Sequence, residues 1–103
     1  MGNCRARLLG SLGKREIPIW QVEVEPASDW HEGMWLDYVG PWNRILEAAY
    51  QYTWTHPWMC HIVELEDHES GWIEFEVDLR TYIQTSNRSG MRRRVRRVLA
   101  RPP

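Results

Sequence analysis

Apolar and polar residues alternate with a period of two along much of the chain, which predicts β-strands. The clearest case is residues 72–79, where apolar side chains on one side alternate with acidic ones and Trp72 on the other. The predicted strands cover residues 17–24, 34–39, 60–66, 72–79 and 91–99. Residues 81–85 read as a brief continuation of the fourth of these strands.

Residues 41–52 follow the helical period instead. Trp42, Ile45, Leu46 and Ala49 recur at i, i+3, i+4 and i+7, and a proline opens the segment. A proline is tolerated in the first helical turn because its missing N–H has no partner there. The segment is therefore predicted to be a helix of about three turns, and it is the one helix that the pattern predicts.

One helix among several strands predicts an α+β domain. The domain is expected over residues 17–99, between a flexible lead-in at 1–16 and a short tail at 100–103. Each element has an apolar face, and these faces should meet in one core. The predicted core residues are Trp20, Tyr38, Ile45, Leu46, Ala49, Val77 and Val95.

Charge is segregated along the 103 residues although the formal net charge is only −1. All fourteen acidic residues lie between Glu16 and Asp78, and seven of the twelve arginines lie between Arg88 and Arg101. A general nucleic-acid binder is usually basic as a whole, so the balanced total argues against that class. The basic strip is expected to face acidic groups within the domain or an external anion.

The last predicted strand sorts its arginines between two faces. If Val95 points to the core, a period of two brings Arg93 and Arg97 to the same face. The residues that then face water are Arg92, Arg94 and Arg96. Because a lone buried charge is costly, an anion must meet Arg93 or Arg97. The candidates are a carboxylate of the domain, Asp78 among them, and a phosphate of a bound ligand.

Several residues occur in a characteristic order between residues 17 and 97. They are Trp20, the W-x-x-Y of residues 35–38, residues 45–50, residues 75–79, Gln84, Asn87, Gly90 and residues 93–97. Together they resemble the WWE domain, and the two tryptophans and the glutamate that name this family would be Trp20, Trp35 and Glu47. The resemblance implies a half-barrel, in which a curved antiparallel sheet packs around a single α-helix.

The resemblance also implies a ligand. WWE domains occur in ubiquitin ligases and ADP-ribosyltransferases, and several bind ADP-ribose or iso-ADP-ribose units of poly(ADP-ribose). By position, Arg93 would pair with the phosphates and Gln84 with a ribose, while Phe75, Leu36 and Val22 would line the pocket. Phe75 stands where a tyrosine hydroxyl would add a hydrogen bond, and the other two stand where aromatic rings would stack. These departures predict binding weakened by about a hundredfold or more.

Two further functions remain open beside ADP-ribose recognition. One is a protein–protein interaction domain with a degenerate ligand pocket, which would contact its protein partner through Trp54 and Trp58 or through the acidic strand. The other is an RNA-contacting strip formed by the outward arginines, whose affinity would depend strongly on salt.

Other classes of site lack a sequence signal. The four histidines and Cys60 match no structural zinc spacing, so no metal and no cofactor are expected. No catalytic set is recognisable, and the chain is predicted not to be an enzyme. With only Cys4 and Cys60, a disulfide framework is not expected, which favours an intracellular location, nuclear or cytoplasmic. The opening MGNCRAR does not complete an acylation signal, because Ala6 stands where that signal carries Ser or Thr.

Overall fold

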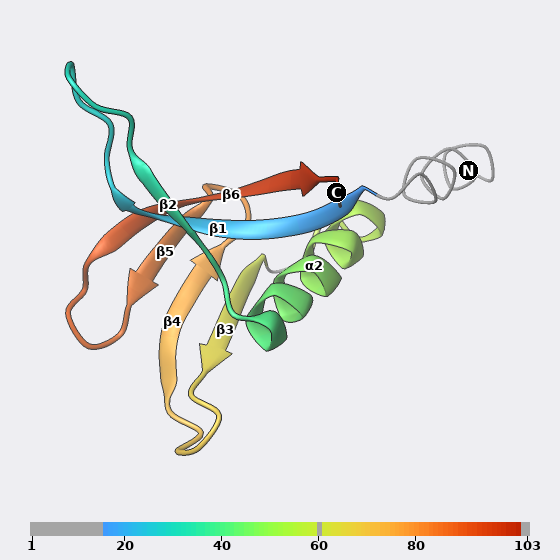
Figure 1. The fold of residues 1–103 in the computed structure, drawn as a ribbon. Helices are drawn as coiled ribbons and strands as arrows, with labels where there is room; N and C mark the ends of the chain where they lie inside the picture. Colours follow the sequence, from blue (N-terminus) through green and yellow to red (C-terminus); the bar gives the residue numbers. More distant parts are fainter. Residues whose placement is uncertain (1–15, 60, 102–103) are drawn as a thin grey trace.

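The computed structural model describes residues 16–59 and 61–101, which form one helix and a six-stranded antiparallel sheet. The helix is α2 (Gly40–Thr55). The strands are β1 (Ile17–Glu25), β2 (Met34–Asp37), β3 (Ile62–Glu66), β4 (Ile73–Asp78), β5 (Ile83–Ser86) and β6 (Arg92–Ala100). The strand order is β2-β1-β6-β5-β4-β3, and the helix contacts β1 and β3 from the concave side of the curved sheet (Figure 1). The predicted α+β half-barrel around a single helix is confirmed.

The core lies between the helix and the sheet and is built around Trp20, which is fully buried. Its ring stacks on Tyr82 with centroids 6.1 Å apart and meets the edge of Tyr50 at 5.5 Å. The buried apolar side chains are Trp20, Tyr38, Leu46, Val63, Leu65, Val77, Leu79 and Val95. Five of the seven predicted core residues are in this set, and Ala49 packs against it half-buried.

Ile45 was predicted to be in the core, and this prediction is wrong because its side chain is 44% exposed. On α2, only Leu46 is buried, while Trp42 and Ala49 are half-buried. The apolar stripe of the helix is thus wider than the surface that the sheet covers. Ile45 lies at the edge of that stripe and remains open to solvent.

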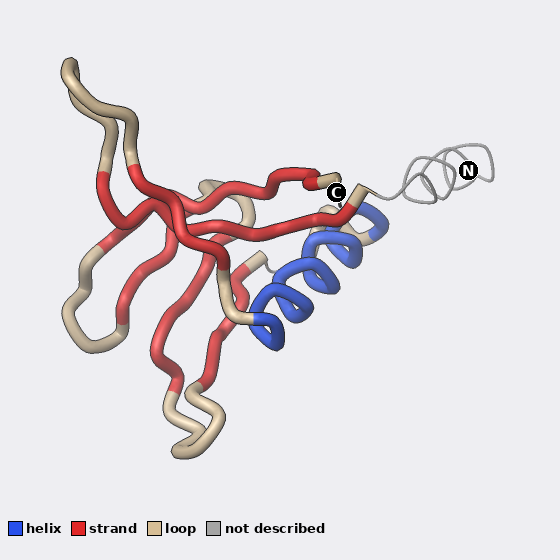
Figure 2. The backbone as a smooth tube through the Cα atoms, in the orientation of Figure 1, coloured by secondary structure: helices blue, strands red, loops and turns tan. Residues whose placement is uncertain are grey.

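Residues 81–85 do not continue β4, contrary to the prediction. The chain turns after β4, and the Tyr82 N–H donates to the carbonyl of Asp78 at 2.8 Å. Tyr82 adopts a φ of 57°, which is uncommon for a residue with a side chain. In this conformation its ring stacks on Trp20. The turn makes β5 a separate strand between β4 and β6 (Figure 2).

The ends of the elements differ slightly from the predictions. The helix continues to Thr55, one turn beyond its predicted end, and the second strand stops at Asp37. β6 reaches Ala100, the first residue of the predicted tail. Apart from Glu16, the predicted lead-in at 1–16 lies outside the described residues, and so does Cys60. No helix in the described part of the chain is long and apolar enough to cross a membrane.

Candidate functional site

β6 separates its arginines as the alternation predicts. Val95 is 4% exposed, and Arg93 and Arg97 lie half-buried on the same face. The arginines on the opposite, exposed face are Arg92, Arg94 and Arg96. The strand therefore brings two guanidinium groups towards the concave side of the sheet, where each needs an anion or hydrogen-bond acceptors.

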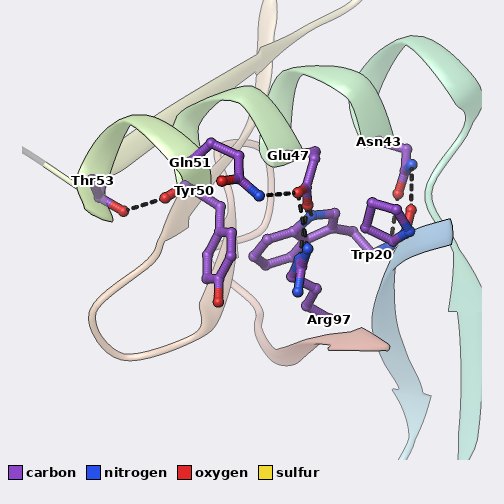
Figure 3. A network of polar contacts seen from close by, with 8 residues as sticks. Trp20, Asn43, Glu47, Tyr50, Gln51, Thr53 and Arg97 are labelled. Atoms are coloured by element: carbon purple, nitrogen blue, oxygen red, sulfur yellow. Dashed lines mark hydrogen bonds and ion pairs between the residues drawn. The ribbon is translucent and has the colours of Figure 1, made fainter. Parts of the chain in front are cut away.

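Arg97 finds its anion within the domain, in Glu47 of the helix (Figure 3). The Arg97 Nε and Nη2 donate to the two carboxylate oxygens of Glu47 at 2.8 and 2.9 Å. The same carboxylate accepts from Trp20 Nε1 at 3.0 Å and from Gln51 Nε2 at 2.7 Å. The guanidinium also lies 4.5 Å from the ring centroid of Tyr50. Arg97 thus links β6 to the helix, and its guanidinium is already paired with a carboxylate of the domain.

The Glu47 cluster, defined as Glu47, Arg97, Trp20 and Gln51, holds its carboxylate in the charged form. Burial alone would raise the pKa of Glu47, but the hydrogen bonds from its three partners outweigh burial and hold the pKa below its usual value. Beside the cluster, Asn43 fixes the start of β1, because its Oδ1 accepts from the Trp20 N–H at 2.6 Å (Figure 3). These contacts make the cluster a structural joint between α2, β1 and β6.

Acid should weaken this joint. A carboxyl whose pKa is lower in the folded state stabilises the fold above its unfolded pKa, and that stability is lost as the pH falls towards the folded pKa. For Glu47 the loss begins near the ordinary value of 4.5. Between pH 7 and pH 3 the melting temperature should therefore fall less steeply for Glu47→Gln than for the wild type. Parallel pH dependences in the two proteins would contradict a depressed pKa at Glu47.

On the outer face of the sheet, two of the three exposed arginines are also engaged. Arg94 donates through Nε and Nη2 to both carboxylate oxygens of Glu23, at 3.0 and 2.6 Å, and Glu23 is only 8% exposed. The hydrogen bond from Arg94 lowers the pKa of Glu23. Arg96 lies over the ring of Trp35, 4.2 Å from its centroid. Of the three, only Arg92 has no partner among the described residues.

Arg93 differs from Arg97 in its partners. Its Nη1 donates to the backbone carbonyls of Val24 and Glu23 at 2.8 and 3.4 Å, and no carboxylate within residues 16–59 and 61–101 pairs with it. Asp78, which was suggested as a partner, instead lies 3.7 Å from Arg80, so that suggestion is wrong. Arg93 is therefore a half-buried cation with most of its N–H donors uncommitted.

Gln84 lies directly opposite Arg93 in the β5–β6 pairing. It is 5% exposed, and its Oε1 accepts from the Tyr38 hydroxyl at 2.7 Å. Burial raises the pKa of Tyr38, which keeps this hydroxyl protonated as a donor. No described residue accepts a hydrogen bond from the Gln84 Nε2. Every fully buried polar side-chain atom in the described parts of the chain has a partner, so Nε2 is not fully buried and its N–H donors are available.

The apolar site residues lie on the same face. Val22 pairs with Leu36 across β1–β2 and with Val95 across β1–β6. Phe75, two residues before Val77 on β4, packs edge-on against Trp42 with centroids 5.7 Å apart. Paired residues of neighbouring strands share a face of the sheet. All five predicted contacts thus lie on the concave face, and together they are called the concave site: Val22, Leu36, Phe75, Gln84 and Arg93.

Two tryptophans singled out from the sequence lie outside this site. Trp54, near the end of α2, is 64% exposed, and Trp58 in the following turn is 75% exposed. They remain candidates for a protein contact. In the described part of the chain, no three histidine, cysteine or acidic side chains converge as metal ligands would.

Most of the sequence matches a known family. The family model of the WWE domain matches residues 18–97. The chain belongs to the WWE family. A search of curated proteins finds no match to it. WWE domains are binding and interaction modules and are not usually catalytic. In this WWE domain, the Trp20 indole N–H donates to Glu47, while Trp35 lies beneath Arg96 on the outer face.

Proposed function

We propose that this WWE domain is a non-catalytic module that recognises ADP-ribose or iso-ADP-ribose units of poly(ADP-ribose) at the concave site. The observation that carries the proposal is Arg93, a half-buried cation that contacts two backbone carbonyls and, among the described residues, no carboxylate. A pyrophosphate would supply the missing anion and suits the planar fork of a guanidinium. Such a ligand fits a protein that acts inside cells, in ubiquitin or ADP-ribosylation pathways.

The other site residues have chemistry that suits the rest of the ligand. The free N–H donors of Gln84 match the hydroxyl oxygens of a ribose, and its position opposite Arg93 keeps the two contacts adjacent. Leu36, which is 52% exposed, and the half-buried Val22 and Phe75 offer apolar surface for an adenine. A direct test is a calorimetric titration of the whole chain with ADP-ribose, iso-ADP-ribose and poly(ADP-ribose).

Restoring polar and aromatic contacts should strengthen this binding. Phe75→Tyr adds a hydroxyl on the concave face, and Leu36→Trp adds a stacking surface at an exposed position. Each contributes on the order of 1 kcal/mol, so the double variant should bind iso-ADP-ribose roughly tenfold to thirtyfold more tightly. Calorimetry on both proteins measures the difference, with thermal melting as the check that the larger side chains do not overfill the site.

The matched control is Leu99→Trp, because Leu99 is 46% exposed near the far end of β6, away from the concave site. It should leave the affinity unchanged. A double variant that stays folded and gains no affinity would count against an ADP-ribose pocket. It would favour the second candidate function, a protein-interaction domain with a degenerate pocket, which is supported by the exposure of Trp54 and Trp58.

A further inference from the structure

A groove of about 590 Å³ lies between the N-terminal part of α2 and strand β3 with the loop that follows it. Figure 1 shows these two elements side by side. One wall is apolar and includes Val39, Trp42 and Ile45. The other wall is formed by the edge strand β3 and its loop, where three acidic residues, Glu64, Glu66 and Asp67, line the groove together with His68 and Gly71. No residue of the concave site lines this groove, so it is a separate feature of the fold.

The apolar wall is uncovered and firmly positioned. Val39 is 60% exposed and Ile45 is 44% exposed, although Ile45 belongs to the apolar stripe of the helix. Trp42 is held at both ends, because its Nε1 donates to the Glu66 carbonyl at 3.0 Å and its ring packs against Phe75. A wall fixed in this way requires little rearrangement to accept an apolar side chain.

The acidic wall is not neutralised. Within the described ranges, neither Glu64 nor Glu66 receives a side-chain hydrogen bond or an ion pair, whereas Glu23 and Glu47 are each paired with an arginine. Glu64 also lies directly opposite Glu76 in the β3–β4 pairing. Like charges directly across an antiparallel pair are destabilising. The fold therefore keeps a local excess of negative charge beside an open apolar surface.

We propose that this groove binds a short segment of another protein, in which one apolar side chain lies close to two lysines or arginines. The apolar side chain would pack between Val39 and Ile45. The cations would pair with Glu64 and Glu66 at the edge of the sheet, where these exposed residues alternate with the buried Val63 and Leu65. Charge complementarity selects this occupant. Nucleic acids and anionic lipid surfaces would be repelled by the acidic wall, and a purely apolar segment would bury the carboxylates without partners.

The test uses a display library of random dodecapeptides selected on the full chain. The expected result is a consensus with an apolar residue near two basic residues. A labelled synthetic peptide with that consensus is then titrated by fluorescence anisotropy. Glu64→Gln combined with Glu66→Gln should weaken its binding by about fivefold to thirtyfold, and Ile45→Ser by about tenfold. Raising the salt concentration should weaken binding to the wild type more than to the double variant.

Two control variants match these changes in kind and exposure. Glu69→Gln removes an exposed carboxylate from the same loop without touching the groove, and Tyr52→Ser removes a 49% exposed side chain from the same helix. Both should bind the peptide like the wild type. If Ile45→Ser lowers the melting temperature, Val39→Ser takes its place.

Three results would overturn the proposal. In the first, selection on the wild type yields the same consensus as selection on the variant with Glu64→Gln and Glu66→Gln. In the second, the consensus contains no basic residues. In the third, the groove variants and the controls affect peptide binding equally.

Discussion

Glu47→Ala should lower the free energy of unfolding by about 2–4 kcal/mol, which is a large effect for a polar residue of α2. The substitution leaves Arg97 half-buried without its carboxylate and removes the acceptor of the Trp20 indole N–H. For a domain of this size the melting temperature should fall by roughly 10–20 °C. Thermal and denaturant unfolding at pH 7 measure both quantities.

The control for this prediction is Glu64→Ala, because Glu64 is an exposed carboxylate without a partner in the described ranges. Its effect on stability should stay within about 0.5 kcal/mol. Arg97→Ala should destabilise the domain as well, and the double variant with Glu47→Ala should cost less than the sum of the two. Equal losses for Glu47→Ala and Glu64→Ala would contradict the role of the Glu47 cluster.

The alternation of β6 predicted the orientation of its side chains correctly because a strand allows only two faces. Once Val95 was placed inward, Arg93 and Arg97 had to share its side, and the structure confirms this. The partner of Arg97 could not be predicted, because Glu47 lies 50 residues away on another element. Asp78 was a wrong candidate for the same reason. The pattern of a strand tells which side chains share a face of the sheet. It does not tell which strands or helices lie next to that strand, so it cannot identify a partner.

The concave site shows a similar limit. Gln84 and Arg93 were assigned from the resemblance to the family, whereas their direct pairing depends on β5 being a separate strand. Residues 81–85 were read as part of the preceding strand because their apolar pattern continues, and the turn at Tyr82 has no glycine to mark it. The Tyr38 hydroxyl that orients Gln84 also escaped prediction, since the two residues are 46 positions apart.

Burial was harder to predict than orientation. The alternation along residues 17–24 places Glu23 on the polar face of its strand, where the structure also has it, yet it is only 8% exposed and is paired with Arg94. Ile45 was placed on the apolar face of the helix, also correctly, yet it is open to solvent. In both cases the pattern along one element indicates a direction, while exposure depends on the side chains of neighbouring elements. The groove beside Ile45 therefore has no counterpart in the sequence pattern.

Arg93→Ala should weaken binding of iso-ADP-ribose by roughly 10-fold to 150-fold, because a hydrogen bond to a charged group contributes about 1.5–3 kcal/mol. The same change should have little effect on stability. Among the described residues, no carboxylate would be left unpaired by its loss, and only the carbonyls of Val24 and Glu23 lose a donor. Calorimetric titration and thermal melting of the variant separate the two effects.

The matched control is Arg92→Ala, which removes an exposed arginine from the same strand and should change neither affinity nor melting temperature. The sequence pattern places Arg94 on the same water-facing side of the strand. Arg94 is not a suitable control, because it pairs with the nearly buried Glu23 and its loss should destabilise the sheet. If Arg93→Ala and Arg92→Ala bind the ligand equally well, the uncommitted donors of Arg93 do not hold a phosphate. If Arg93→Ala instead melts as low as Glu47→Ala, the role of Arg93 is structural, and recognition of ADP-ribose loses the observation on which it rests.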